Sequence, residues 1–567
     1  MCGIIGIVGR TSTRPTPSLD ELLIGLDTAI EASEDLPAAT AAARSVDRQL
    51  RGVAGVRAIL SAPEVSVGII ARLDRLDAVA DASEAQLDRR AAELSAPELE
   101  QANAEIIALR DALWAIRNDR LRMASAVAAI AGVDVGTDAS AAYLAGYLAI
   151  ERACTAIDRL EVRGRDSAGV HVYVWNHDLD DASLEALLAE RGDDPLFRSG
   201  AAVAVAPGVL SFVYKTAAEI GELGDNTAAI RRGVVGDELL RRVLRSPDAR
   251  IAVLGHTRWA SVGIISEPNT HPLNSVEAAP SGLVSDAGAD PYVVAALNGD
   301  VDNHADLRVE HHLAIPTAVT TDAKIIPTLV ARRLRDGVAP VEAFRRTVAE
   351  FDGSVAIGAA VATDPGRLFV ALRGSGQGLY VGFADDAYVV ASEPYGVVEE
   401  SDRYLRLDGE HGGEIVVLDG DRDGPDGLER LAYDGIAAPV TEDDVAIAEV
   451  TTRDIDRGSA PHYLLKEITE SPMSLAKTLR GKIESVGDEL IATVGDMALP
   501  TTIAQRLANG TIMRVRVIGQ GTAAVAGQST AALLDELTDG ALDVDAITAT
   551  ELSGFAMRLD MSDTLAI

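Results

Sequence analysis

The chain opens with the stretch MCGIIGIVG, residues 1–9. Removal of Met1 would make Cys2 the N-terminal residue, with a thiol and a free α-amine on neighbouring atoms. A free thiol has a pKa of about 8.5 and an α-amine one of about 7.7–8.0, so one residue would supply a nucleophile and a base. Residues 4–8 are apolar and β-branched, which predicts a buried strand holding Cys2 at its start.

Composition limits the class of protein. The 567 residues predict about three to five domains. Hydrophobic residues make up 47% of the chain, enough for a large core. The net charge of −36 argues against a nucleic-acid-binding surface, which needs a basic face, so we expect no nucleic-acid partner.

Two cysteines, Cys2 and Cys154, are too few for a disulfide framework, an all-cysteine zinc site or an iron–sulfur cluster. Cys154 lies in an Ala/Leu-rich stretch and is predicted to be a buried residue of a helix. Apolar runs are too short for a transmembrane helix, and the N-terminus lacks the pattern of a signal peptide. We therefore expect a cytoplasmic protein without a membrane partner, a metal or a cofactor.

Residues 31–141 differ from their surroundings, because Ala, Leu, Arg and Glu dominate and apolar residues recur at spacings of three and four. This periodicity predicts a helical insert, a hairpin or a small bundle, interrupted at Pro63 and Pro97. The insert could be a packing appendage or an arm that binds a partner.

The remainder predicts a β-rich domain followed by an α/β unit. Strand-like segments recur between residues 171 and 418, with helices such as 322–335 between them. Residues 513–537 form a strand, a glycine turn and a helix, which opens an α/β unit, with a next strand at 542–547. The predicted domains are 1–30 with 142–420, the insert 31–141, a boundary and interdomain linker 421–511, and an incomplete domain 512–567.

Five short stretches carry chemistry as a set, although each alone would be a weak signal. Asn-Gly alone is a common turn, a lone arginine is usually solvated, and Asp322 alone would cap the following helix. The stretches are CGI at residues 2–4, RGRDSAG at 163–169, GHTRWA at 255–260, NTHP at 269–272, and LNG at 297–299 with NH at 303–304.

Together these motifs resemble those of the N-terminal-nucleophile (Ntn hydrolase), class II glutamine amidotransferases. Their exact sequences resemble most those of the glutamine–fructose-6-phosphate aminotransferases. Residues 461–472 resemble the interdomain linker of that family. The resemblance implies an α+β fold, with an αββα sandwich of two antiparallel sheets between helices. It also implies that residues 512–567 begin an α/β sugar-phosphate isomerase (SIS) domain.

The resemblance assigns the chemistry of glutamine hydrolysis to particular residues. Cys2 would attack the side-chain amide and form a thioester, and the Asn298 side chain and the Gly299 N–H would form the oxyanion hole. Arg258 would bind the α-carboxylate of glutamine, and Asp322 its α-ammonium group.

Supporting roles follow from the same resemblance. Trp259 and Ser261 would line the glutamine pocket, Arg163 would support the Cys2 end of the site, and Thr522 would belong to a sugar-phosphate loop.

Three positions near the glutamine site depart from the family pattern. Leu297 replaces a histidine, Val262 replaces another histidine, and Lys324 stands where an acidic residue is common. In the sugar-phosphate loop, Gln520 and Ala523 replace a cysteine and a serine.

The function expected from the resemblance is glutamine hydrolysis that supplies ammonia for converting fructose 6-phosphate to glucosamine 6-phosphate in hexosamine biosynthesis. Most of the synthase half would lie outside this chain, so fructose 6-phosphate would bind only with a further C-terminal domain. The resemblance also suggests a homodimer. Two alternatives stay open: another class II amidotransferase, or a non-catalytic regulatory homologue.

Overall fold

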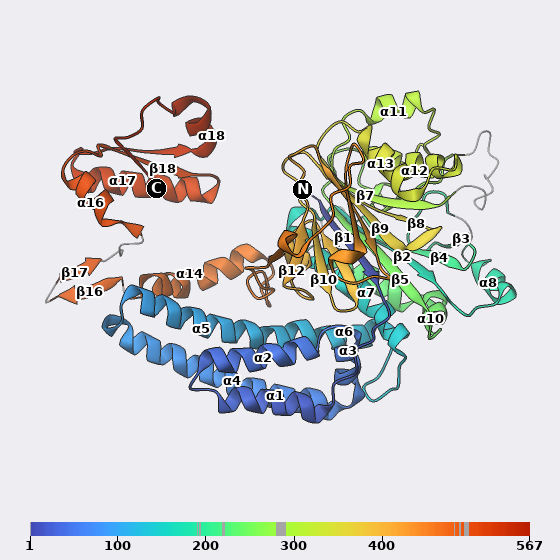
Figure 1. Cartoon of the computed structure of the whole chain (residues 1–567), viewed down its shortest axis with the longest axis horizontal. Helices are drawn as coiled ribbons and strands as arrows, with labels where there is room; N and C mark the ends of the chain where they lie inside the picture. Colours follow the sequence, from blue (N-terminus) through green and yellow to red (C-terminus); the bar gives the residue numbers. More distant parts are fainter. Residues whose placement is uncertain are drawn as a thin grey trace. The chain divides into compact units, whose positions relative to one another are not determined.

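The computed structural model describes residues 2–189, 191, 194–217, 222–278, 291–480, 482–486, 489–492 and 498–567. The chain forms two compact units, one of Met1–Ala85 with Asn103–Ser471 and one of Gln86–Ala102 with Pro472–Ile567 (Figure 1). The first unit contains two large antiparallel sheets and most of the helices.

The N-terminal strand β1 (Gly3–Gly9) lies inside a nine-stranded sheet, antiparallel to β5 (Arg250–Arg258) on one side and β11 (Ala387–Ala391) on the other. The strand predicted at residues 4–8 is therefore confirmed. The full order is β15-β12-β10-β11-β1-β5-β2-β4-β3. The other strands are β2 (Ser167–Trp175), β3 (Ala202–Ala206), β4 (Val209–Thr216), β10 (Tyr380–Ala384), β12 (Arg403–Arg406) and β15 (Val445–Ile447).

A second sheet has six strands in the order β14-β13-β9-β8-β7-β6. Its strands are β6 (Leu273–Asn274), β7 (Val293–Gly299), β8 (Val355–Val361), β9 (Asp364–Arg373), β13 (Glu414–Asp419) and β14 (Leu428–Ala432). Both sheets thus continue past residue 420, since β14 pairs with β13 and β15 pairs with β12.

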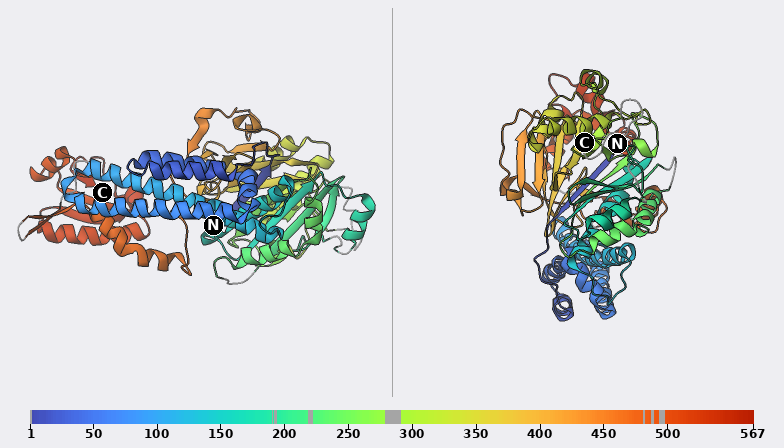
Figure 2. Two further views of the ribbon diagram at one scale, coloured as in Figure 1. Left: turned by 90° about the horizontal axis from the view of Figure 1, so that it is seen from below. Right: turned by 90° about the vertical axis from the view of Figure 1, so that its right-hand side faces the viewer.

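The two sheets pack face to face, and helices cover their outer faces. Alternation along β1 sends Ile4 and Val8 into the core between the sheets and Ile5 and Ile7 into the core beneath the helices. Helix α7 (Ala141–Leu160) lies against the nine-stranded sheet, while α12 (Ile325–Arg335) and α13 (Pro340–Ala349) cover the other. This helix–sheet–sheet–helix layering, visible in Figures 1 and 2, agrees with the predicted α+β sandwich.

Residues 31–141 are mostly helical, and long helices run side by side there (Figure 2). Pro63 begins α4 and Pro97 is the second residue of α5, where proline costs no helix hydrogen bond. The predicted interruptions at these prolines are confirmed. The helices are α1 (Leu19–Glu31), α2 (Leu36–Gln49), α3 (Gly52–Ser61), α4 (Pro63–Arg90), α5 (Ala96–Trp114), the π-helical Ala115–Arg122 and α6 (Met123–Ala131).

These helices share one apolar core with the sheet, because Leu26 and Leu73 belong to the same buried cluster as Ile5 and Ile157. Cys154 is fully buried in α7, as predicted. In the described part of the chain, no single helix combines the length and the apolar character needed to cross a membrane. Helices α3 and α4 meet that criterion only as a pair, bent by 103°.

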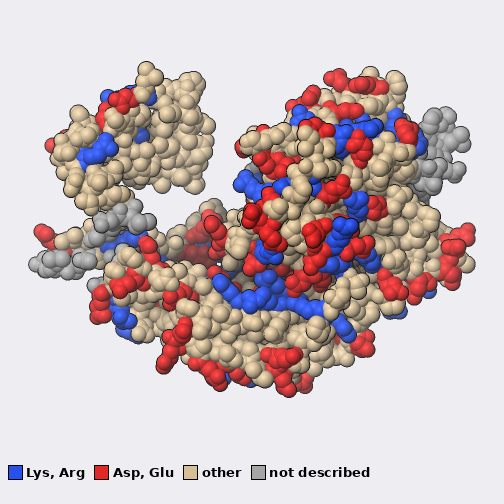
Figure 3. Space-filling view, in the orientation of Figure 1, with Lys and Arg blue, Asp and Glu red and all other residues tan. Residues whose placement is uncertain are grey.

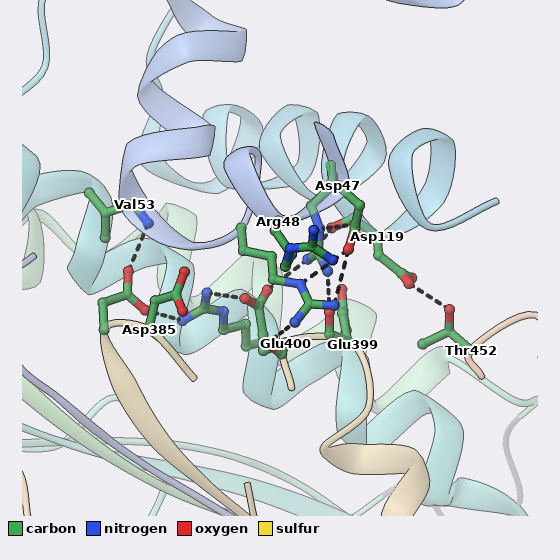
Figure 4. A network of polar contacts seen from close by, with 12 residues as sticks. Asp47, Arg48, Val53, Asp119, Asp385, Glu399, Glu400 and Thr452 are labelled. Atoms are coloured by element: carbon green, nitrogen blue, oxygen red, sulfur yellow. Dashed lines mark hydrogen bonds and ion pairs between the residues drawn. The ribbon is translucent and has the colours of Figure 1, made fainter. Parts of the chain in front are cut away.

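A buried network of charges joins the same helices to the loop at residues 399–400 (Figure 4). Arg120 pairs with Asp47 at 2.8 Å and with Glu400 at 3.2 Å, and its side chain is 2% exposed. Asp119 accepts a 2.6 Å hydrogen bond from Thr452 Oγ1. Burial and the neighbouring Glu399 carboxylate raise the pKa of Asp119 to about 7.

The second unit contains a parallel sheet with β18 (Arg514–Gly519) between β19 (Asp543–Thr548) and β20 (Thr564–Ala566). Helix α17 (Thr522–Thr538) follows Gly521, whose φ of +58° forms the turn. The predicted strand, glycine turn and helix are confirmed, as is the strand predicted at 542–547. The unit also contains the hairpin β16 (Ile483–Val486) and β17 (Glu489–Ala492), α16 (Thr501–Ala508) and the short α18 (Ala549–Glu551).

Other helices are α8 (Asp181–Leu188), α9 (Asp225–Val235), α10 (Glu238–Leu244), α11 (His304–Glu310) and α14 (Tyr463–Leu479). Acidic side chains are spread widely over the face shown in Figure 3, in keeping with the net charge of −36. A band of basic side chains runs along one edge of the helices on that face.

Candidate active site

Strand pairing brings the predicted nucleophile and the predicted carboxylate clamp together. Strands β1 and β5 are antiparallel and pair Gly3 with Thr257. The first residue of β1 therefore lies beside the last residues of β5. Cys2 precedes β1, and Arg258 ends β5. Residues 257 positions apart in the sequence thus come into contact.

The Cys2 thiol contacts the backbone of Trp259 twice. The Trp259 N–H donates to Sγ at 3.2 Å, and Sγ lies 3.4 Å from the Trp259 carbonyl oxygen. Burial raises the pKa of the Cys2 thiol, against the lowering effects of the Trp259 hydrogen bond and the Arg258 charge. Met1 lies outside the described residues, so its removal stays a prediction.

Arg258 is 2% exposed and is held by the loop that follows it. Its Nη1 donates to the Ile264 carbonyl at 3.2 Å, and its Nη2 donates to the Val262 carbonyl. The family pattern has a histidine at the position of Val262. The contact with Arg258 is made by the backbone carbonyl, so it does not depend on that side chain. Burial lowers the pKa of the guanidinium, which retains further N–H donors for a carboxylate.

Asn298 and Gly299 end strand β7, in the sheet that faces β1 and β5. The Oδ1 atom of Asn298 lies 3.1 Å from His256 Nε2, and its buried Nδ2 has no hydrogen-bond partner among the described residues. Gly299 has a φ of +88°, and a Cβ there would lie 1.9 Å from the Ser354 carbonyl oxygen. Only glycine fits, so the chain turns out of the strand at this point.

Leu297 does not face the same side as Asn298. Its side chain is buried with Ile326 and Phe344 in the core beneath α12 and α13, because successive residues of a strand point to opposite faces. The departure at Leu297 therefore changes the helix-covered core. Its backbone carbonyl accepts a 3.0 Å contact from His256 Nε2.

Asp322 is 4% exposed and begins the turn before α12. Its Oδ2 accepts a 2.8 Å hydrogen bond from the Val301 N–H, and its Oδ1 one of 3.2 Å from Thr321 Oγ1. The carboxylate is thus anchored to the segment after Gly299 and does not cap α12. Burial raises its pKa.

Sequence reasoning missed Asp300, which stands between Gly299 and the Val301 N–H that holds Asp322. Ser261 Oγ donates to Asp300 Oδ1 at 2.9 Å. Burial is the main cause of the raised pKa of the Cys2 thiol, and Asp300 adds to it. The available signal was an acidic residue directly after the Asn-Gly pair.

Sequence reasoning also assigned no role to Asp166, although it lies within the RGRDSAG motif of residues 163–169. Its Oδ2 accepts from the Ala260 N–H at 2.8 Å, and its own N–H donates to the Arg258 carbonyl at 3.0 Å. These contacts fix the backbone around Trp259, whose side chain is 59% exposed.

Arg163 forms an ion pair with Glu393. The next residue, Gly164, lies so close to the β5 end that a Cβ would meet the Trp259 nitrogen at 2.5 Å. Lys324 is buried, and its Nζ donates to the Asn274 carbonyl at 2.6 Å, to Asn274 Oδ1 at 2.9 Å and to the Val276 carbonyl at 2.8 Å. Thr522 is exposed at the start of α17, in the second unit.

Known proteins were compared with the whole chain. No protein-family model matches the chain. A glutamine–fructose-6-phosphate aminotransferase (isomerizing) of Bacillus cereus is 27% identical over 282 residues, 50% of this chain and 43% of the relative. Those of Geobacillus kaustophilus and Bacillus subtilis strain 168 are 28% and 29% identical, each over 52% of this chain and 42% of the relative.

The chain thus spans less than half the length of these curated relatives, and the predicted resemblance to them is confirmed over about half of the chain. Among solved structures, a glutamine phosphoribosylpyrophosphate amidotransferase of B. subtilis complexed with ADP and GMP matches with 17% identity and a TM-score of 0.31. It covers 50% of this chain and 46% of that one, and a TM-score this low supports no conclusion about fold or function.

Proposed function

We propose that this chain hydrolyses glutamine through Cys2, as the glutaminase part of a glutamine–fructose-6-phosphate aminotransferase. The observation that carries the proposal is the meeting of three strand ends. Cys2 contacts the residue after Arg258, and Asn298 contacts β5 through His256. These contacts support a site in which Cys2 would be the nucleophile, Arg258 the cationic clamp and Asn298 the oxyanion donor. Sequence similarity over half the chain supports the same chemistry.

In the proposed reaction, the Cys2 sulfur attacks the side-chain amide carbon of glutamine. The carbonyl oxygen becomes an oxyanion, which accepts hydrogen bonds from Asn298 Nδ2 and the Gly299 N–H. One such donor stabilises a transition state by about 3–4 kcal/mol. The α-amine of Cys2 takes the thiol proton and passes it to the departing nitrogen, which leaves as ammonia. Water then cleaves the thioester and releases glutamate.

The amino-acid end of glutamine would be held by opposite charges on either side. The Arg258 guanidinium would bind the α-carboxylate. The α-ammonium would bind Asp322, with Asp300 as a second carboxylate nearby. Trp259 and Ser261 would line the pocket, and Arg163 would support its Cys2 end.

The use of the ammonia is proposed for the whole, longer protein. There it would convert fructose 6-phosphate to glucosamine 6-phosphate in hexosamine biosynthesis, with Thr522 in a sugar-phosphate loop of a SIS domain that begins at about residue 512. Residues 1–30 and 142–420 would form most of the glutaminase domain, whose two sheets continue into β14 and β15, and 31–141 would form an insert. The whole protein would be a cytoplasmic homodimer.

Glutamate release tests the proposal. Purified chain is incubated with glutamine without fructose 6-phosphate, and the intact mass of the same sample shows whether Met1 is gone. We expect glutamate and ammonia in equal amounts from Met1-free protein and none from protein that keeps Met1. No release from Met1-free protein would contradict the catalytic proposal and favour a non-catalytic homologue.

A further inference from the structure

We infer that His256 is a positioning residue of the oxyanion site, which fixes the Asn298 amide so that its nitrogen faces the substrate. This inference rests on the proposed glutamine hydrolysis. His256 lies on β5 opposite Ile4 of β1, and its side chain reaches across to β7 of the facing sheet.

The hydrogen-bonding pattern assigns the His256 tautomer. Nε2 lies 3.0 Å from the Leu297 carbonyl oxygen and 3.1 Å from Asn298 Oδ1. A backbone carbonyl can only accept, so Nε2 must carry the proton. The Asn298 side-chain atom beside Nε2 must then be an acceptor, because an NH₂ group there would place two donors against each other. The acceptor of the amide is its oxygen, Oδ1.

This assignment determines where the Asn298 donor points. With Oδ1 held by His256, Nδ2 lies on the other side of the amide, where no described residue accepts from it. A buried donor without a partner is uncommon in proteins and marks a site that a ligand can complete. The oxyanion formed from glutamine is such a ligand.

The surroundings keep His256 neutral and in place. The residue is fully buried, and its ring lies 4.5 Å from the His271 ring at an interplanar angle of 40°. Burial and the Arg258 charge lower the pKa of His256 to about 3. His256 Nδ1 has no hydrogen-bond partner among the described residues. The proposed role of His256 is therefore to position Asn298, and not to act as a general acid or base.

His271 links the same strand to the Asp322 turn. Its Nδ1 accepts from the Leu297 N–H at 3.4 Å, and its Nε2 lies 3.4 Å from Thr321 Oγ1. Thr321 Oγ1 in turn contacts Asp322 Oδ1 at 3.2 Å. The two neighbouring histidines therefore contact both the proposed oxyanion end and the proposed ammonium end of the site.

A double-mutant cycle tests the inference on Met1-free protein. His256→Met removes the donor at similar volume, and His256→Gln retains an N–H donor. We expect His256→Met to lower kcat about 10- to 100-fold, with little change in KM. This loss should not exceed that of Asn298→Ala, which removes the oxyanion donor. His256→Gln should retain most of kcat. In an Asn298→Ala background, His256→Met should cause no further loss.

Equal losses from His256→Met in both backgrounds, or a loss confined to KM, would overturn the positioning role while glutamine hydrolysis stands. A second measurement does not depend on turnover. The Asn298 Nδ2 NMR signals, assigned by their absence in Asn298→Ala, should shift in His256→Met and not in His256→Gln. Unshifted signals in both variants would overturn the inference, whereas an inactive wild-type chain would overturn the proposed function.

Discussion

The Trp259 N–H donates a 3.2 Å hydrogen bond to the Cys2 sulfur, across 257 positions of sequence. This contact exists because β1 and β5 are antiparallel neighbours, so the start of β1 lies beside the end of β5. A backbone donor to sulfur favours the thiolate, and it opposes the effect of burial on the pKa of Cys2.

Cys2→Ala should abolish glutamate release, because no other described nucleophile occupies the start of β1. Cys154→Ala is the matched control, since Cys154 is fully buried in α7 and should be dispensable for activity. The melting temperature of Cys2→Ala should change by no more than about 2 °C, as for a substitution outside the core. Activity near that of the wild type would place the nucleophile elsewhere.

Arg258→Lys should raise the KM for glutamine and lower kcat/KM about 10- to 100-fold, because an ammonium cannot reproduce the two-pronged carboxylate contact. Arg406→Lys, at an exposed position on β12, is the control and should leave both constants unchanged. Steady-state kinetics with glutamine measure the effect. An unchanged KM would show that the α-carboxylate binds another group.

Asp300→Asn should move the reactivity of Cys2 to lower pH. The Asp300 carboxylate contributes to the raised pKa of the thiol, so removing its charge should lower that pKa and give more thiolate at neutral pH. Alkylation rates with iodoacetamide, followed from pH 6 to 10 in a Cys154→Ala background, measure the shift. Asp302→Asn is the control, and an identical profile for both variants would contradict the assigned role of Asp300.

Gly299→Ala should destabilise the protein and impair turnover, because a Cβ would lie 1.9 Å from a backbone oxygen at a φ of +88°. Gly136→Ala is the control, since Gly136 has a φ of +89° with nothing within 4 Å of its Cβ position. The control should cost about 1 kcal/mol from the positive φ alone, and Gly299→Ala should cost more. Equal shifts in melting temperature for Gly299→Ala and Gly136→Ala would mean that the backbone at Ser354 moves to make room for the added Cβ.

Asp119→Asn should change how stability depends on pH. The pKa of Asp119 is raised to about 7 in the folded state, so between about pH 4 and 7 the folded chain binds more protons than the unfolded chain. The free energy of unfolding of the wild type should therefore fall relative to the variant as pH rises through this range. Melting temperatures from pH 5 to 8 measure the difference.

Asp81→Asn serves as the control for the Asp119 variant. Asp81 pairs with Arg110 at the surface, where its side chain is 74% exposed, so its removal should give a nearly constant difference across the same range. A constant difference for Asp119→Asn as well would show that this carboxyl does not titrate near neutrality.

Local features of the chain could be predicted because local chemistry determines them. A continuous apolar, β-branched run of residues 4–8 can be buried on both faces, and it forms the central strand β1. Pro63 and Pro97 lie in the first turn of their helices. Proline has no backbone N–H, and the N–H groups of the first turn have no partner within the helix, so proline costs no hydrogen bond there. The roles of the site residues were assigned by resemblance and stay proposals until they are measured.

The sequence by itself determined the position of Cys2, the proposed nucleophile, the strand that follows it and the Asn-Gly turn. Only the tertiary structure decided that Trp259 contacts Cys2, that Leu297 points away from the site and that Val301 holds Asp322. It also revealed Asp300 and His256 as parts of the site. The physical reason is that these contacts depend on strand register and on the stacking of two sheets, which join residues far apart in the chain and leave no local pattern.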